Sequence, residues 1–218
     1  NLISKKTRDI LNANGHDSPL GKVSKKKWTE YLDNKVKKIK IKKNSNILEY
    51  GCGSGAFLSH FYNNNFNLYG IDYSKNLIDI AKRLIPEGKF LEDEAINIQG
   101  NEKELDLILS HSVFQYFPSQ EYAKEVLMKA TSMLKIGGQL CLLDINDKSK
   151  AESYHFERAK EYSSVAEYKK NYQGLNHLFF DKDDLRLFLS DLGYQDIQIF
   201  PHFNKSYGNQ KFRFNIKA

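Results

Sequence analysis

Three glycines at alternate positions, Gly51, Gly53 and Gly55, are the first residues of the sequence that could take part in chemistry. They follow a short apolar run at 47–50 that suits a buried strand, and apolar residues at helical spacing come after them. Because glycine has no Cβ, the backbone can turn tightly and a ligand can lie directly against it. A strand, a glycine turn and a helix form the nucleotide-binding corner of an open α/β sheet. We therefore expect a cofactor that contains a nucleoside or a nucleotide at this turn.

The acidic residue Glu49 helps to decide which class of cofactor fits. The turn also satisfies the dinucleotide pattern, with Gly51, Gly53 and the permitted final alanine Ala56. A carboxylate so close to the turn would repel a pyrophosphate but attract a cationic sulfonium or ammonium group. The segment Glu49-x-Gly51-x-Gly53-x-Gly55 resembles motif I of the class I (Rossmann-like) S-adenosylmethionine-dependent methyltransferases. This resemblance implies S-adenosylmethionine as the cofactor and S-adenosylhomocysteine as its product.

Two later segments resemble further motifs of that family. Asp72 ends the second expected strand, and together with Tyr73 it resembles the second motif, which implies that Asp72 binds the ribose hydroxyls. The acidic turn that contains Glu94 and Ala95 resembles the third motif. It implies that Glu94 and the backbone N–H of Ala95 bind the adenine, with Asp93 as the alternative acid. The alternative interpretation of these acids is an ordinary charged surface loop.

The residues that follow the apolar strand at 105–109 resemble the fourth motif. The resemblance implies that Ser110 lines the cofactor pocket. It places His111, Gln115 and Tyr116 near the acceptor. Methyltransferases that modify the amino groups of bases often have Asn or Asp-Pro-Pro-Tyr at this place. This chain has Ser-His-Ser-Val instead, which counts against methylation of an exocyclic amine in DNA or RNA.

The acceptor decides whether the site needs a general base. A sugar hydroxyl needs one, and His111 is the first candidate. His177 and His155 are the next candidates, and Tyr116 could orient the acceptor. A phosphate or carboxylate oxygen is already anionic and needs cationic partners instead, for which the candidates are Arg158, Lys205, Lys211 and Arg213. Taken singly, each of these side chains is more often a packing or surface residue than a catalytic one.

The elements that must position these residues follow from the alternation of strand and helix patterns. Strands are expected at 46–50, 67–71, 89–91, 105–109, 139–144, 195–200 and 210–216. Helices are expected at 55–64, 74–84, 120–134 and 183–192. This order predicts an α/β fold with a doubly wound, mostly parallel seven-stranded sheet and a closing antiparallel hairpin.

Two segments outside this alternation are expected to cover the site as lids that exclude water. Residues 1–44 are interpreted as an N-terminal helical flank, with Trp28 on the apolar side of its helix. Residues 45–218 are interpreted as the cofactor-binding domain, with an inserted helical cap at 146–180 that is polar and aromatic. The candidate contacts to the substrate are Trp28, Tyr31, Gln115, His155, Arg158 and Arg213.

Composition narrows the class of protein. The 218 residues suffice for one α/β domain, and no apolar run approaches the length of a membrane span. The two cysteines, Cys52 and Cys141, suit buried positions better than a disulfide, so we expect a cytoplasmic protein. No spacing of histidines or cysteines suits a metal site.

The net charge of +6 is concentrated near the N-terminus, where residues 1–43 hold thirteen Lys and Arg against four Asp and Glu. A basic flank can bind nucleic acid, an anionic surface or an anionic small substrate. The simpler interpretation is the solvated face of an amphipathic helix at 24–40, capped by Ser24 and including Lys35. We therefore expect methyl transfer to an oxygen of a small molecule, with an anionic acceptor as one option and nucleic acid not favoured as a partner. An RNA or protein methyltransferase that uses the basic arm is the alternative, and an NAD-binding oxidoreductase is less favoured still.

Overall fold

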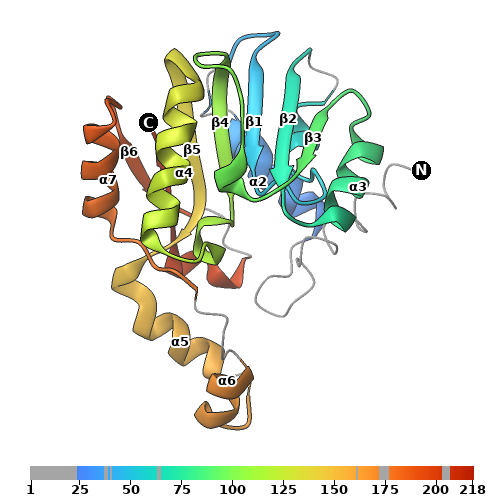
Figure 1. The fold of residues 1–218 in the computed structure, drawn as a ribbon. Helices are drawn as coiled ribbons and strands as arrows, with labels where there is room; N and C mark the ends of the chain where they lie inside the picture. Colours follow the sequence, from blue (N-terminus) through green and yellow to red (C-terminus); the bar gives the residue numbers. More distant parts are fainter. Residues whose placement is uncertain are drawn as a thin grey trace.

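The structure is a computed structural model that describes residues 24–36, 39, 41–62, 65–160, 162–171, 177–202 and 207–218. Within these residues, seven strands form one sheet in the order β3-β2-β1-β4-β5-β7-β6 (Figure 1). The strands are β1 (Asn46–Tyr50), β2 (Asn67–Asp72), β3 (Lys89–Glu92), β4 (Leu105–His111), β5 (Leu134–Asn146), β6 (Gln198–Pro201) and β7 (Arg213–Lys217). The first five run parallel, and β7 is antiparallel to both β5 and β6. The predicted α/β fold, with its mostly parallel sheet and closing hairpin, is confirmed.

Alternate residues of the central strands belong to two separate hydrophobic cores, one on each face of the sheet. In β5, Leu140 and Leu142 pack into the first core, while Cys141 and Leu143 pack into the second. Successive side chains of a strand point to opposite faces, so a strand that is apolar throughout must be covered on both sides. The near-continuous apolar runs of β1, β4 and β5 therefore require helices on both faces.

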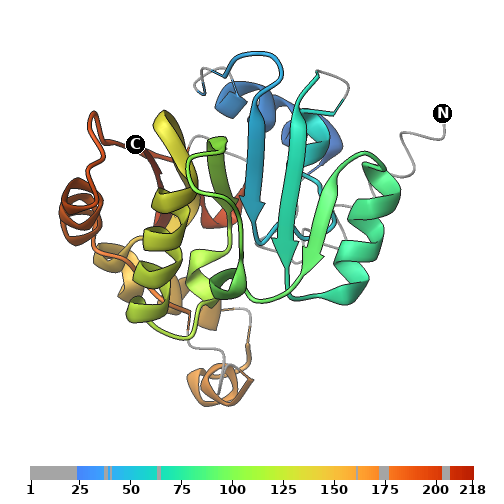
Figure 2. The ribbon, with the colours of Figure 1, turned by 45° about the horizontal axis from the view of Figure 1, so that its top comes forward.

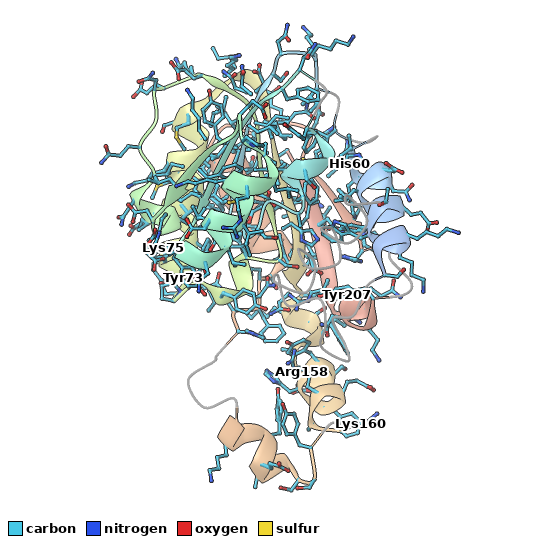
Figure 3. The ribbon with its side chains drawn as sticks, turned by 90° about the vertical axis from the view of Figure 1, so that its right-hand side faces the viewer. His60, Tyr73, Lys75, Arg158, Lys160 and Tyr207 are labelled. Atoms are coloured by element: carbon cyan, nitrogen blue, oxygen red, sulfur yellow. The ribbon has the colours of Figure 1, made fainter. Side chains whose placement is uncertain are left out.

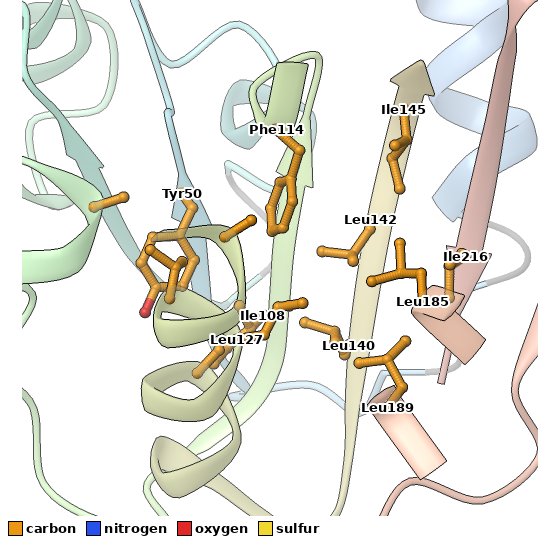
Figure 4. Close-up of a cluster of buried hydrophobic side chains, with 14 of the residues drawn as sticks. Tyr50, Ile108, Phe114, Leu127, Leu140, Leu142, Ile145, Leu185, Leu189 and Ile216 are labelled. Carbon is orange, nitrogen blue, oxygen red and sulfur yellow. The ribbon is translucent and has the colours of Figure 1, made fainter. Parts of the chain in front are cut away.

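Helices meet this requirement on each face. They are α2 (Lys25–Val36), α3 (Lys75–Leu84), α4 (Gln120–Met133), α5 (Ala151–Ala159), α6 (Val165–Asn171) and α7 (Lys182–Asp191). Leu127 of α4 and Leu185 of α7 pack on the first face, with Ile108 of β4 and Ile216 of β7 (Figure 4). The helices α2 and α3 contribute to the core of the second face.

The chain order leaves a crevice at the carboxyl ends of the central strands. From β1 the chain moves outward to β2 and β3, and it then returns to β4 on the other side of β1. Such a reversal separates the connections on either side of it, and ligands of open α/β sheets bind there. Figures 1 and 2 show α5 and α6 beyond the ends towards which the parallel strands point. The cap segment is thus placed at the same end of the sheet as the crevice.

The helix expected at 55–64 is wrong. The structure has turns there and only a short 3-10 helix, η1 (Leu58–His60). The segment buries Phe57, Leu58 and Phe61, and Ser59 Oγ donates a hydrogen bond to the backbone carbonyl of Ala56 (2.9 Å). Aromatic, Ser, His and Asn residues have modest helix propensity, and serine bonds of this kind compete with the helical pattern. Burial of the three large side chains therefore decides the local backbone.

The interpretation of the basic helix face needs a correction at Lys35. The helix α2 lies within the expected range, and Ser24 Oγ accepts a hydrogen bond from the backbone N–H of Lys27 (3.4 Å), whereas residues 37–38 and 40 fall outside the described part of the chain. Lys35 is 3% exposed, and its Nζ lies 5.0 Å from the ring centroids of both Tyr31 and Phe200. The position is therefore part of the packing between α2 and the sheet and not of a solvated face.

Candidate active site

The glycine turn after β1 has a backbone that only glycine adopts easily. Gly51 and Gly53 have φ angles of +64° and +52°, in the left-handed region. A Cβ at Gly51 would overlap the side chain of Val113, which follows β4. Gly55 packs against Ala81 of α3 and does not line the cavity described below. The first two glycines therefore let the turn pass directly under the neighbouring strand end.

Asp72, at the end of β2, ties this turn to the next helix. Its Oδ2 accepts a hydrogen bond from the backbone N–H of Gly53, and its Oδ1 accepts one from Ser74, both at 2.9 Å. Each carboxylate oxygen has a second lone pair for a ligand hydroxyl. Tyr73, the next residue, is 74% exposed and also lines the cavity (Figure 3). The predicted ribose-binding acid thus lies beside the glycine turn.

Glu49 is buried at the bottom of the same crevice, with an exposed fraction of 2%. Burial and, next, the nearby Asp72 raise the pKa of its carboxyl group well above the usual value, against the opposing effect of the Leu58 backbone N–H. Its Oε2 has no hydrogen-bond partner among the described residues, although Glu49 lines the cavity. A buried carboxyl oxygen without a partner is costly, and a cationic ligand would relieve that cost.

The acidic turn after β3 contains the remaining residues that were predicted to bind the adenine. Asp93 Oδ1 accepts hydrogen bonds from the backbone N–H of Glu94 (2.8 Å) and from Asn97 Nδ2 (2.7 Å). Asn97 and then Glu94 thereby lower the pKa of Asp93. Glu94 Oε2 accepts a hydrogen bond from the hydroxyl of Tyr122 (3.2 Å). Asp93, Glu94 and Ala95 all line the cavity.

The end of β4 lies between the acids described above and a second group of polar residues, described below. His111, Gln115 and Tyr116 line the cavity, whereas Ser110 is 1% exposed and does not. Gln115 is also 1% exposed, and its Oε1 has no hydrogen-bond partner in the part of the chain that the structure describes. A cavity-lining amide with a spare acceptor suits the polar part of a ligand. The structure therefore leaves Ser110 in the packing and brings its neighbours to the cavity.

Aromatic rings enclose His111. Its Nε2 lies 3.0 Å from the hydroxyl of Tyr31, and its ring centroid lies 5.3 Å from that of Trp28 and 5.6 Å from that of Phe57. Trp28 lines the cavity, but Tyr31 lies behind it, stacked on His202 at 5.1 Å. The aromatic contacts and the tyrosine hydroxyl together fix the orientation of the imidazole.

A second group of polar residues comes from the cap and the closing strands. Arg158 of α5 donates a hydrogen bond from Nη1 to the hydroxyl of Tyr154 (2.8 Å). The same hydroxyl oxygen lies 2.9 Å from Nδ1 of His177. Burial and then the charges of Arg213 and Arg158 lower the pKa of His177 to about 4, so its imidazole is neutral at pH 7. His155 is exposed, bonds through Nδ1 to Tyr168 (2.7 Å) and does not line the cavity.

The remaining candidate cations differ in position. Arg213 opens β7, is 6% exposed and lines the cavity. Lys211 does not line the cavity, and its Nζ lies 3.6 Å from Oε1 of Glu157. Lys205 falls outside the described residues. Of the predicted cations that the structure describes, Arg158 and Arg213 line the cavity and Lys211 does not.

Sequence reasoning missed a buried acid, Asp144 in β5, as a hub of this region. The hydroxyls of Ser112 and Tyr207 both donate to its Oδ2, the second at 3.3 Å. His202 Nε2 lies 3.6 Å and Arg213 Nε 3.9 Å from its Oδ1. Burial alone would raise the pKa of Asp144, but Arg213 and then His202 outweigh it and hold the pKa well below its usual range. The sequence signal that could have identified Asp144 is an acid directly after four apolar residues of an expected strand.

These residues surround one cavity with a volume of about 1010 Å³. Its acids lie at the ends of β1 and β2 and directly after β3, and its arginines come from α5 and from β7, which lies beyond β4 and β5 in the sheet. The predicted site residues that line it are Trp28, Glu49, Gly51, Gly53, Asp72, Tyr73, Asp93, Glu94, Ala95, His111, Gln115, Tyr116, Arg158, His177 and Arg213. Those that do not are Tyr31, Gly55, Ser110, His155 and Lys211.

The described residues contain no group of three His, Cys, Asp or Glu side chains that could hold a metal ion. Cys52 and Cys141 are both buried free thiols. None of the helices in the described ranges is both long and apolar enough to cross a bilayer.

The sequence of this chain matches a known protein family over most of its length. Residues 25–199, most of the chain, match the family described as "Methyltransferase domain". A nonribosomal peptide synthetase of Metarhizium robertsii is 24% identical over 191 residues, which cover 81% of this chain and 2% of that protein. Malonyl-[acyl-carrier protein] O-methyltransferase 1 of Ilyobacter polytropus is 31% identical over 115 residues, 50% of this chain and 41% of that protein. The chain thus spans less than half the length of these relatives.

Solved structures agree on the fold. The TehB-like SAM-dependent methyltransferase of Corynebacterium glutamicum superposes with a TM-score of 0.58 at 16% identity, covering 88% of this chain and 85% of that one. The buried Glu49 carboxyl beside the glycine turn fits a cationic, phosphate-free ligand better than a pyrophosphate. Because the family match spans most of the chain, this protein belongs to the class I S-adenosylmethionine-dependent methyltransferase family.

Proposed function

We propose that the protein transfers the methyl group of S-adenosylmethionine to an oxygen atom of a small-molecule acceptor. One observation carries the proposal. A single cavity joins the acids near the glycine turn to the arginines of α5 and β7, and the end of β4 lies between them. Its volume of about 1010 Å³ lies at the upper end of the range for ligand pockets, which is in keeping with a cofactor and a small acceptor side by side.

The residues of the first half would hold the cofactor. We assign the ribose to Asp72, the adenine to Glu94 or Asp93 with the backbone N–H of Ala95, and the cationic methionine part to Glu49. The unpartnered Oε2 of Glu49 supports the last assignment. When bound, S-adenosylmethionine supplies a methyl group on a positively charged sulfur, which keeps the electron pair of the broken C–S bond as the acceptor oxygen bonds to the methyl carbon.

For a hydroxyl acceptor, His111 is the candidate base. It lines the cavity, and its Nε2 contact with Tyr31 and its packing against Trp28 hold the ring in place. It would take the hydroxyl proton as the new O–C bond forms. His177 is the weaker candidate, since a pKa of about 4 makes its imidazole a poor proton acceptor. Tyr116, which lines the cavity and lies 5.0 Å from the His177 ring, would orient the acceptor.

The enclosure of the site would favour transfer by excluding water, which competes for the methyl group and screens charges. We assign this role to the flank 1–44 and the cap 146–180. Support comes from Trp28 of the flank and Arg158 of the cap, which both line the cavity. The relative from Ilyobacter polytropus is named as an O-methyltransferase, which supports oxygen as the accepting atom.

Cofactor binding and methyl transfer are tested in two steps. S-adenosylmethionine and S-adenosylhomocysteine should each raise the melting temperature of the protein by mass action, whereas NADH should not. The Asp72→Ala variant should lose most of that increase. Sugars, phosphorylated compounds and carboxylic acids are then screened for cofactor-dependent gain of a methyl group on oxygen. A methyl group found on nitrogen or carbon of the preferred acceptor would refute the proposed atom.

A further inference from the structure

We infer that the second half of the cavity contains a subsite for a carboxylate or phosphate group of the acceptor, with Arg158 as its main contact. The inference rests on the proposed function, because it names the substrate class of the same cavity. It also makes a separate claim, since anion binding is measurable without turnover.

The charges that line the cavity are segregated. The carboxylates are Glu49 near the end of β1, Asp72 at the end of β2, and Asp93 and Glu94 directly after β3. The described residues that line the cavity from α5, residue 177 and the segment 207–213 include two arginines and no carboxylate. A cavity with opposite charges on its two sides favours a cationic ligand on one side and an anionic ligand on the other. The cofactor accounts for the first side only.

Tyr154 organises the two arginines. The Cζ atoms of Arg158 and Arg213 lie 5.3 and 5.8 Å from its ring centroid. Its hydroxyl accepts the hydrogen bond from Arg158 and contacts His177, as described above. A guanidinium held against an aromatic ring keeps several N–H groups in a fixed plane, which suits two-point binding of a carboxylate or phosphate. The arrangement therefore presents preorganised donors without ordering a flexible side chain.

The surroundings of Arg213 contain a further unsatisfied donor. Arg213 is 6% exposed, and its Nε has no hydrogen-bond partner among the described residues, since Asp144 Oδ1 is 3.9 Å away. Asp144 offsets the charge of this arginine but leaves the N–H unused. Asn209, which is 5% exposed, also lines this part of the cavity. A buried N–H without a partner is costly, and a small displacement of the Arg213 side chain towards an anion in the cavity that it lines would relieve that cost.

The two arginines have different roles in this subsite. Arg213 is buried close to Asp144, whose negative charge offsets its own. Arg213 would therefore orient the anion more than it adds net positive charge to the subsite. Arg158 is half-buried on α5, and Figure 3 shows it between Tyr207 and Lys160 in that view. Removal of Arg158 should therefore weaken recognition of the anion while the core stays folded.

Isothermal titration measures this directly. Inorganic phosphate and malonate are titrated separately into the protein saturated with S-adenosylhomocysteine, at constant ionic strength. We expect at least one probe to bind, and the Arg158→Gln variant to bind it about tenfold or more weakly, as for loss of a hydrogen-bonded charge. Lys160→Gln is the matched control. Lys160 has the same charge and lies two residues further on, but it pairs with Glu157 at 3.0 Å and does not line the cavity.

Each outcome bears on the inference. Binding of phosphate alone assigns a phosphorylated acceptor, binding of malonate alone assigns a carboxylic acid, and both support the subsite. Equal weakening in Lys160→Gln, or unchanged affinity in Arg158→Gln, overturns it. If S-adenosylhomocysteine binds but neither anion does, the subsite is refuted and the proposed function stands. If S-adenosylhomocysteine does not bind, the proposed function fails together with the inference.

Discussion

The two halves of the cavity are built in different ways. The cofactor half consists of a glycine turn and three strand ends, and its acids accept hydrogen bonds from nearby backbone N–H groups. The acceptor half consists of side chains that are held by other side chains, with Asp144 and Tyr154 as the supports. Backbone geometry therefore positions the side chains of the cofactor half, whereas a buried network of charges and hydrogen bonds positions those of the acceptor half. Mutations should therefore affect the two halves by different mechanisms.

The largest expected effect comes from removing the support of the acceptor half. Asp144→Ala leaves Arg213 buried without its counter-charge, which should lower the free energy of unfolding by about 3–5 kcal/mol. Urea denaturation measures this loss. The control is Asp79→Ala, because Asp79 forms an i,i+4 pair with Lys75 in which the side chains are 42% and 67% exposed, and such pairs contribute about 1 kcal/mol or less. Similar losses in both variants would contradict the role of the buried network.

The next largest effect tests the backbone of the cofactor half. Gly51→Ala adds a Cβ that overlaps Val113 at a positive φ, so it should lose about 2–3 kcal/mol of stability from strain and overpacking. It should also lose binding of S-adenosylhomocysteine. Gly137→Ala is the control, since Gly137 has a φ of +78° but no atom within 4 Å of the added Cβ. Retained cofactor binding in Gly51→Ala would show that the turn tolerates a side chain.

A smaller effect concerns the pH dependence of stability in the acceptor half. The folded-state pKa of His177, about 4, lies below the usual value of about 6.5. Below pH 6.5 the unfolded chain therefore binds a proton that the folded protein does not, and stability should fall as the pH drops from 6.5 towards 4. We expect a loss of about 1–2 kcal/mol between pH 7 and pH 5. Urea denaturation of His177→Gln at both values should show a shallower dependence, and an unchanged slope would disprove the assignment.

The smallest effect is a pH dependence of cofactor affinity that belongs to Glu49. Burial raises the pKa of this carboxyl group, while the cationic methionine part needs it ionised. Affinity for S-adenosylmethionine should therefore decrease as the pH falls through the raised pKa. In Glu49→Gln the affinity should be about tenfold lower at high pH and insensitive to pH over the same range. Calorimetric titration at several pH values measures both, and a parallel slope in the variant would assign the titration to another group.

The sequence allowed more of the cofactor half to be predicted than of the acceptor half. The glycine turn, Asp72 and the 93–95 turn follow strands whose apolar runs are easy to recognise, and the structure brings them to one cavity. Ser110 was expected there but lies in the packing, because residues of a strand alternate between faces and a single position decides which face is reached. The expected helix at 55–64 failed because buried aromatic side chains outweighed a helical spacing of apolar residues.

By itself, the sequence determined the order of the strands, the mostly parallel sheet and the place of the glycine turn. These features depend on local periodicity and on residues a few positions apart. Only the tertiary structure decided that Asp144 supports Arg213 and Tyr207, and that Tyr154 holds Arg158 beside His177. Such pairs join residues far apart in the chain, and the energy of a buried charge depends on its neighbours in space, which no spacing in the sequence records.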